Sequence, residues 1–340
     1  MVRIGVVGAN GRLGSMMVET LQRHDDVEVV AISSIRRPQW PDSVVHHRFD
    51  GTMGSPQELR SVLSGIDALI SAAPSRDADL HAVAIESGCH VMDVSVQLEV
   101  IKRLLALDEL ARSQRRSLIA MAGLIGLTGL AGLELTERAP QAASIQICLI
   151  QSANGSAGEH GTREMIDMLT ERHNRFHRRV RQSPGQPTVT QTKLFNLASA
   201  ETDILAGDDK LAFATGFDSP GLNAVIRALA GIRAVAPPVY RTLRDAVARR
   251  KATAREATEE DVELSAVALG SAGVVAGWNS LRFDSDYGAT AAIACSTAMM
   301  AQTGNLRAGA GHLSDFVRLA DLIDHPVMRK VVLASAARDL

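Results

Sequence analysis

Apolar positions in the first third of the chain fall into short continuous runs, separated by stretches in which apolar residues recur at helical spacing. Such runs are typical of buried parallel strands, and the stretches between them are typical of crossover helices. We therefore predict an α/β domain with a parallel sheet. Strands are expected at Val2–Val7, Val27–Ile32, Ala68–Ser71, His90–Met92 and Leu118–Met121. Helices are expected at Ser15–Leu21, Pro56–Ser64, Asp77–Ser87 and Leu98–Arg112.

The pattern changes near Ala143, where alternation of apolar and polar residues begins and indicates a second domain. Further strands are predicted at Ser144–Ser152, Thr188–Leu197, Val262–Leu269 and Val274–Asp284. Further helices are predicted from Thr162 and at Arg227–Lys251, Ala289–Gln302 and Leu313–Leu322. Because the last two helices are expected to return to the first domain, we predict one domain of residues 1–122 plus 287–340 and a second of residues 123–286.

A glycine turn joins the first strand to the first helix and is the strongest functional signal. Gly8 permits a tight turn, Gly11 lets the backbone approach a pyrophosphate, and Gly14 lets the helix pack close to the strand. The helix N-terminus then faces the anion. The predicted cofactor-binding residues of this turn also include Asn10, Arg12 and Leu13. The alternative is a glycine turn that holds no ligand.

The end of the second strand indicates which dinucleotide is bound. An acidic residue there holds the ribose 2′-hydroxyl of NAD, but this chain has Ser33, Ser34, Arg36 and Arg37 in that region. Arginine and serine side chains can donate charge-assisted hydrogen bonds to a 2′-phosphate. We therefore predict NADP (NADPH) as the cofactor. A solvated arginine pair on a surface loop is the alternative.

The carboxyl ends of the third and fourth predicted strands supply further candidates, since ligands of such sheets bind at that edge. Ala72, Ala73 and Pro74 follow one strand, and Ser95 follows the other; all four are predicted to contact the cofactor. Asp93 is a candidate catalytic residue that orients a substrate amine. Alternatively, it caps the turn from Ser95 to Leu98.

A turn before the first helix of the second domain is the predicted substrate site. Glu159, Gly161, Thr162 and Arg163 surround free backbone N–H groups at a helix N-terminus, which suits a carboxylate. His160 is the first choice for proton transfer, because its ordinary pKa lies near neutral pH. The alternative is that Thr162 caps the helix and His160 is merely solvated.

Composition excludes several classes of protein. The 340 residues are 46% hydrophobic and 22% charged with a net charge of −2, so no global field attracts nucleic acid or an anionic membrane. The three cysteines have no metal-ligand spacing and fit a reducing compartment, hence a cytoplasmic protein without a metal site. The basic run Arg172–Arg181 is expected to form the solvent face of a packed helix.

The chain resembles the saccharopine dehydrogenase-like NAD(P)-dependent reductases. The matching features are the glycine turn, the run Leu69–Pro74, the segment Ala84–Asp93 and the turn at Ala122–Gly123. The resemblance implies a Rossmann domain, a second α+β domain with a glyceraldehyde-phosphate-dehydrogenase-like antiparallel sheet, and hydride transfer at a carbon–nitrogen bond of an amino-acid derivative. Where many relatives have a proline–glycine pair after the last of the first-domain strands, this chain has Ile125–Gly129. The opening is also similar to dihydrodipicolinate reductase.

Two functional hypotheses follow. The first is an NADP-dependent oxidoreductase that acts on a small carboxylated amine or imine. The second is a sensor or scaffold that binds NADP(H) without turnover, because no compelling acid–base pair stands out. In either case the apolar residues of Val262–Asp284 exceed what a one-sided sheet hides, which predicts a homodimer through that sheet.

Overall fold

The computed structural model describes most of the chain. The described residues are 1–34, 40–49, 56–73, 78–153, 159–170, 176–184, 186, 188, 190–196, 210–252, 261–304 and 306–339. The side chains of residues 56, 160, 176, 196, 251, 252, 338 and 339 lie outside this description. Arg36, Arg37 and Pro74 of the predicted cofactor site, and the side chain of His160, therefore carry no structural statement.

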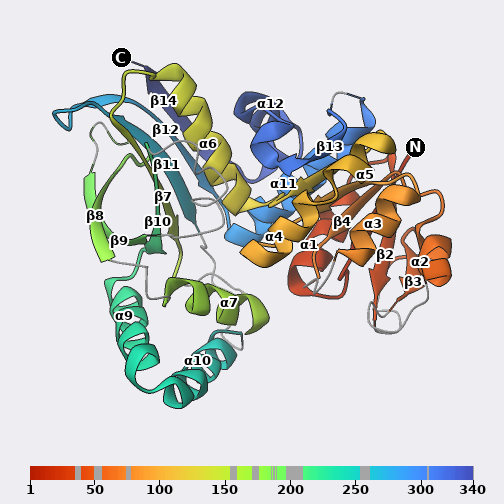
Figure 1. Cartoon of the computed structure of the whole chain (residues 1–340), viewed down its shortest axis with the longest axis horizontal. Coiled ribbons are helices and arrows are strands. Elements are labelled where there is room, and N and C mark those ends of the chain that lie inside the picture. The colour runs from red at the N-terminus through yellow and green to blue at the C-terminus, as the bar shows by residue number, and fades with distance from the viewer. Residues whose placement is uncertain are drawn as a thin grey trace. The chain divides into compact units, whose positions relative to one another are not determined.

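The chain forms two compact units, whose elements are labelled in Figure 1. The first comprises residues 1–130 and 287–330, and the second comprises residues 131–286 and 331–340. The boundary expected from the sequence lies at residue 122, with the whole C-terminal segment in the first domain. The C-terminal difference arises because β14 (Val332–Asp339) pairs with β12 (Val275–Phe283) in the sheet of the second unit.

Seven strands form the sheet of the first unit, and every pairing in it is parallel. Their order is β13-β6-β5-β4-β1-β2-β3, and the direction of progression reverses between β1 and β4. Ligands of such sheets bind at the carboxyl ends near this reversal. The strands are β1 (Val2–Val7), β2 (Val27–Ser33), β3 (Val45–Arg48), β4 (Ala68–Ser71), β5 (His90–Asp93), β6 (Ser117–Ala120) and β13 (Gly309–His312). The predicted Rossmann-like sheet is confirmed.

Helices accompany the parallel strands of this unit. They are α1 (Arg12–Leu21), α2 (Pro56–Leu63), α3 (Asp79–Glu86), α4 (Leu98–Leu105), α5 (Asp108–Ser113), α11 (Asp286–Gln302), α12 (Leu319–Asp324) and the 3₁₀ turns η1 (Leu313–Asp315) and η2 (Met328–Lys330). α1 buries Met17, Val18 and Leu21 at helical spacing. α11 is buried on nearly all sides, and the thiol of Cys295 contacts the carbonyl oxygen of Met17. The helix expected at Leu98–Arg112 is two helices, because residues 106 and 107 form a turn.

The second unit contains a seven-stranded sheet in the order β14-β12-β11-β7-β10-β9-β8. Its remaining strands are β7 (Ser144–Gln151), β8 (Phe176–Arg181), β9 (Thr190–Asn196), β10 (Leu211–Phe217) and β11 (Val262–Leu269). The expected sheet was antiparallel, but β7 and β10 pair in parallel, so the sheet is mixed. The predicted hairpin of β11 and β12 is present, with Gly273 at a φ of 73° in its turn.

The helix expected over Arg172–Arg181 is wrong, since residues 176–181 form β8. Helical spacing of apolar residues suggested the helix, but pairing partners decide the structure. β8 pairs antiparallel with β9, and the backbone N–H of Val180 donates to Gln146 Oε1 at 2.8 Å. Arg181 forms an ion pair with Glu263 at 2.9 Å. β8 therefore also contacts β7 and β11, so the edge of the sheet curls back over its centre.

This curl bears on the reason for expecting a homodimer. Seven of the eight residues of β11 are buried within the single chain. Burial of both faces of β11 thus accounts for its continuous apolar sequence without a second subunit. The homodimer itself stays a prediction.

The described residues of the second unit also form helices, and α6 (Leu124–Arg138) spans the sequence boundary between the units. They are α7 (Glu159–Leu169), α9 (Pro220–Val235) and α10 (Pro237–Ala252). α9 begins where Ser219 accepts a hydrogen bond from the N–H of Leu222 and Pro220 occupies the first turn. Pro237 begins α10 directly after α9 ends, as the predicted break at the proline pair requires.

Candidate functional site

The β1–α1 turn has the geometry of an anion-binding site. Gly8 has a φ of 79°, and its N–H donates to the carbonyl of Ile32 at 3.0 Å. A Cβ at Gly14 would lie 2.2 Å from the carbonyl oxygen of Gly8, so only glycine lets α1 approach β1 this closely. At Gly11 the described structure opposes a Cβ only with the Gly8 oxygen, at 3.2 Å, and this residue is exposed.

The N-terminus of α1 lacks the groups that usually neutralise a helix end. Gly11 occupies the N-cap position without a side-chain cap, and the first turn contains no acidic residue. The backbone N–H groups of the first helical turn and the helix dipole therefore favour an anion. Asn10 Oδ1 is buried and has no hydrogen-bond partner among the described residues. The turn fits the pyrophosphate of a dinucleotide.

The loop after β4 lies against this turn. The N–H of Ala72 donates to the carbonyl of Val7 at 3.0 Å, and a Cβ at Gly8 would lie 3.0 Å from the backbone nitrogen of Ala73. The structure thus brings Ala72 and Ala73 next to the glycine turn, and their contact with the cofactor stays a prediction. At the end of β4 the hydroxyl of Ser71 is buried and lacks a partner among the described residues.

Asp93, at the end of β5, is buried and fully engaged. Its Oδ1 accepts from the N–H of Ser95 at 2.8 Å, and its Oδ2 lies 2.7 Å from His81 Nε2. Both Asp93 and His81 have no exposed surface. Burial alone would raise the pKa of Asp93, but the hydrogen bonds and charge of His81 and the hydrogen bonds of Ser95 hold this pKa below its ordinary value. Of the two predicted roles for Asp93, these contacts match the turn cap.

Two residues of β3, His46 and Arg48, contact predicted cofactor-site residues at the end of β2 but were not themselves predicted. Ser33 is buried, and its hydroxyl lies 2.9 Å from His46 Nε2. Arg48 is exposed, and its Nε donates to the carbonyl of Ser34 at 3.2 Å. Since Ser33 and Arg48 are register partners, Arg48 lies beside the carboxyl end of β2. The sequence of β3, VHHR, contains no apolar run, so it was not predicted as a buried strand.

The predicted substrate turn belongs to the second unit. α7 begins at Glu159, three residues before the predicted start at Thr162, so Gly161 and Thr162 lie inside the helix. Thr162 is buried. Arg163 forms ion pairs with Glu159 and with Asp245, the latter at 3.2 Å. A substrate carboxylate at Arg163 would therefore compete with two carboxylates already present.

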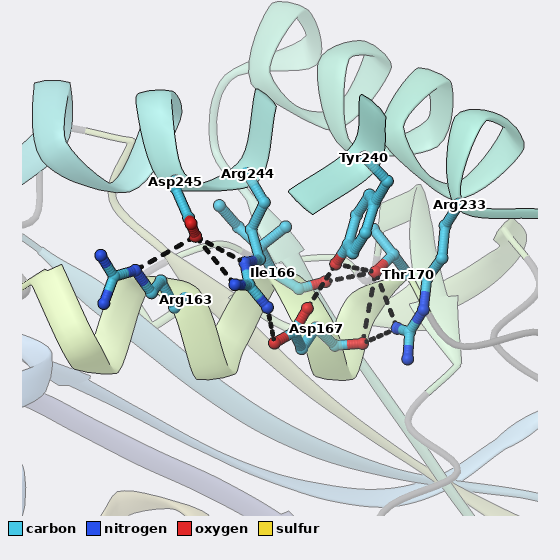
Figure 2. Close-up of polar contacts among 8 residues, drawn as sticks. All are labelled: Arg163, Ile166, Asp167, Thr170, Arg233, Tyr240, Arg244 and Asp245. Carbon is cyan, nitrogen blue, oxygen red and sulfur yellow. Dashed lines mark hydrogen bonds and ion pairs between the residues drawn. The ribbon is translucent and has the colours of Figure 1, made fainter. Parts of the chain in front are cut away.

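Arg163 is one end of a polar network that joins α7 to α9 and α10 (Figure 2). Asp167 is its centre. This carboxylate accepts from the hydroxyl of Tyr240 at 2.6 Å and from Arg244 at 2.6 Å. Arg233 donates to the carbonyl of Asp167 at 2.5 Å and to Thr170 Oγ1 at 3.0 Å.

Ion pairs make up part of this network. Arg163 and Arg244 pair with carboxylates (Glu159, Asp167 and Asp245), whereas Arg233 donates to the backbone carbonyl of Asp167. The hydrogen bond from Arg244 holds the pKa of Asp245 below its ordinary value. Burial, followed by the Asp167 hydrogen bond, raises the pKa of Tyr240 to about 12, so Tyr240 is a neutral donor at neutral pH. The network joins α7 to α9 and α10 through hydrogen bonds and ion pairs.

The cysteines offer no nucleophile. Cys89, Cys148 and Cys295 are all free and buried. Burial raises the pKa of Cys89 and of Cys148 to about 12 and raises that of Cys295 as well. Covalent catalysis by cysteine requires an accessible thiolate, which none of the three provides. In the described part of the chain, no group of histidine, cysteine and acidic side chains is arranged to hold a metal ion, and no helix there is long and apolar enough to span a membrane.

Sequence comparison decides the nature of the first unit. Residues 3–117 match the NAD-binding domain of semialdehyde dehydrogenases. The first unit contains an NAD(P)-binding domain. The match runs from β1 to the start of β6, which includes the glycine turn and the ends of β2, β4 and β5.

Two N-acetyl-gamma-glutamyl-phosphate reductases are similar in sequence to part of this chain. The one from Laribacter hongkongensis is 29% identical over 105 residues, which are 29% of this chain and 30% of that protein. The one from Clostridium novyi is 25% identical over 100 residues, which are 28% of this chain and 29% of that protein. The chain thus aligns with less than a third of the length of these relatives. They support an NAD(P)-dependent reductase in general, and not specifically a saccharopine dehydrogenase-like one.

Two solved structures align along nearly the whole chain. An engineered D-amino acid dehydrogenase bound to NADP⁺ has a TM-score of 0.49 and 13% identity, and the alignment covers 96% of this chain and 99% of the other. A dihydrodipicolinate reductase from Paenisporosarcina sp. TG-14 has a TM-score of 0.49 and 10% identity, with 93% and 100% covered. Likeness at this level carries no information on substrate or cofactor.

Proposed function

We propose that the protein is an NADP-dependent oxidoreductase that transfers hydride at a carbon–nitrogen bond of an amino-acid-derived carboxylate, as saccharopine dehydrogenase-like reductases do. The observation that carries the cofactor part is the uncapped N-terminus of α1 behind Gly8, Gly11 and Gly14. The positive end of the helix dipole at this turn favours a pyrophosphate, and Gly11 leaves space for it.

The preference for the phosphorylated cofactor is supported by the residues at the end of β2. No acidic side chain stands at Ser33 or Ser34 to hold an unmodified ribose or repel a phosphate. Arg48 adds an exposed guanidinium that is anchored to the Ser34 carbonyl. Together with Arg36 and Arg37, it forms the proposed 2′-phosphate site, in which each charge-assisted contact contributes roughly 1.5–3 kcal/mol.

The choice of a carbon–nitrogen bond is supported by the lack of an accessible cysteine nucleophile. All three cysteines are buried with raised pKa values, so a covalent thioester route has no nucleophile. Reduction of an imine needs none, because it takes one hydride from the dihydronicotinamide at carbon and one proton at nitrogen, giving the amine and NADP⁺. We assign the proton transfer to His160 and the substrate carboxylate to the α7 turn at Glu159–Arg163.

A second candidate function is a sensor that binds NADP(H) without turnover. Both oxygens of Asp93 are occupied, and Arg163 is paired with Glu159 and Asp245. Two of the residues assigned to substrate chemistry are therefore engaged within the chain, which favours this alternative. The two functions differ in one observable, namely oxidation of bound NADPH by a small-molecule partner.

The test is a screen of amino acids paired with keto acids or aldehydes, in which NADPH absorbance is followed. An enzyme oxidises NADPH with at least one pair, and with that pair His160→Ala lowers kcat. Binding of NADPH by the purified protein without turnover across the full panel would favour the sensor. Absence of NADPH and NADH binding would exclude both functions.

We further propose that the protein is a cytoplasmic homodimer. Three buried free thiols suit a reducing compartment. Light scattering tests the dimer, and a mass of 36.2 kDa at micromolar concentration would show a monomer.

A further inference from the structure

The strand order divides the sheet of the first unit into two halves, and this inference rests on the proposed binding of a dinucleotide. In sheets of this order, each half binds one mononucleotide at its carboxyl edge. The glycine turn and the ends of β2 and β3 serve the adenosine half. The loops after β4, β5 and β6 then serve the nicotinamide half.

Asp93 ties these three loops together. Its backbone carbonyl accepts from the N–H of Ala122, after β6, at 2.7 Å. Its Oδ1 accepts from Ser95, in the loop after β5, at 2.8 Å. Its Oδ2 accepts from Nε2 of His81, in the first turn of α3, at 2.7 Å. Since α3 follows β4, one buried residue contacts the connections after three neighbouring strands, two of them through its side chain and the third through its backbone carbonyl.

The pair of His81 and Asp93 is a fixed element because both side chains are completely buried. The hydrogen bonds to Asp93 keep its pKa low despite burial, so it is ionised and Nε2 of His81 carries the proton. A buried carboxylate of this kind holds its donors in one geometry.

Two buried polar atoms beside this pair lack a partner among the described residues. They are Nδ1 of His81 and the hydroxyl of Ser71, which is the register partner of Asp93 on β4. Buried polar groups are normally hydrogen-bonded. Among the described residues, the hydrogen bonding at this end of the sheet is therefore incomplete.

We propose that the His81–Asp93 pair positions the loops that bind the nicotinamide half of the cofactor. Asp93 is a positioning residue in this role, because both of its oxygens are committed to groups of the protein. The same commitment removes it as a proton carrier for substrate. The adenosine half binds at strands that the pair does not contact.

The test compares NADPH with adenosine 2′,5′-bisphosphate, which lacks the nicotinamide half, by calorimetry of the full chain. In His81→Leu the affinity for NADPH should fall about tenfold, while the affinity for the bisphosphate stays unchanged. His81→Gln retains a donor to Asp93 and should restore NADPH affinity. Because His81→Leu leaves a buried charge without its partner, the double variant His81→Leu/Asp93→Asn provides a neutral version with the same expected result.

Ser117→Ala is the matched control. Ser117 is equally buried in the same sheet, but it begins β6 at the opposite edge, where its hydroxyl donates to the carbonyl of Arg307 at 2.7 Å. It should leave both affinities unchanged. An equal loss for both ligands in the His81 variants, or no loss for either, would overturn the proposal. If the wild-type protein binds NADH more tightly than NADPH, the same comparison is made with NADH and AMP. If it binds neither dinucleotide, the proposed function and this inference are both refuted.

Discussion

Replacement of Gly11 by alanine separates the cofactor site from the fold. Gly11 has a φ of −72° and a ψ of 160°, which alanine also adopts. The added Cβ would contact only the Gly8 oxygen at 3.2 Å. Alanine is a poorer N-cap residue than glycine, which destabilises the folded state, but it also lowers the conformational entropy of the unfolded chain, which stabilises the folded state. We therefore expect the free energy of unfolding to change by less than about 1 kcal/mol. The methyl group, however, stands where the pyrophosphate would approach the backbone.

We therefore expect Gly11→Ala to weaken NADPH binding by at least tenfold, or about 1.4 kcal/mol, with a nearly unchanged urea midpoint. Gly14→Ala should instead destabilise the protein by roughly 1–3 kcal/mol or more, because its Cβ meets the backbone of Gly8 at 2.2 Å. Gly231, inside α9, has no atom within 4 Å of its added Cβ, so Gly231→Ala should stabilise by about 0.5–1 kcal/mol and leave binding unchanged. Wild-type NADPH affinity in Gly11→Ala would refute the placement of the pyrophosphate.

Three other predictions address stability and chemistry. Burial, with the nearby Arg116 charge, lowers the pKa of His90 from 6.5 to about 4. Between these pH values the unfolded state binds more protons than the folded state, so the free energy of unfolding falls as the pH drops from 6.5 towards 4. His90→Asn should make the free energy of unfolding, measured with urea, less dependent on pH in this range. Tyr240→Phe removes the donor to Asp167 and should cost about 1–3 kcal/mol of unfolding free energy, measured calorimetrically, with NADPH affinity unchanged. With an active substrate, Arg163→Ala should mainly raise KM, whereas His160→Ala should lower kcat by ~10²–10⁴, and full kcat in the latter would remove its proton-transfer role.

The first domain could be predicted from sequence because its signals are local. A buried parallel strand is a continuous apolar run, and the glycine spacing specifies a turn with positive φ at Gly8 and close packing at Gly14. Each of the five predicted strands is present. β3 and β13 were missed because their sequences, VHHR and GAGH, contain no run of apolar residues.

The second domain depended on contacts between residues distant in sequence. The helical spacing around Phe176 and Val180 predicted a helix, but residues 176–181 pair with β9 as a strand. β14 joins the second sheet by pairing with β12, which lies about 50 to 60 residues earlier in the chain. Neither event leaves a local pattern.

The site was predicted in part for the same reason. Asp93 was found from its position at a strand end, but its partner His81 was missed. The available signal was a histidine on the same helical face as the buried residues Ala84 and Ile85, where an apolar residue is usual. Arg163 was assigned to a substrate without its partner Asp245, which lies 82 residues away on α10.

The central claim, that the first unit binds NADP(H), is tested most directly by calorimetric titration of the full chain with NADPH and with NADH, repeated for Arg48→Ala. Arg23→Ala is the control, since this arginine is exposed between α1 and β2, at the opposite edge of the sheet. The account predicts tighter binding of NADPH than of NADH, a loss of roughly 1.5–3 kcal/mol for NADPH alone in Arg48→Ala, and no change in Arg23→Ala. Equal affinities for the two cofactors would contradict the NADP assignment, and failure to bind either would contradict the claim itself.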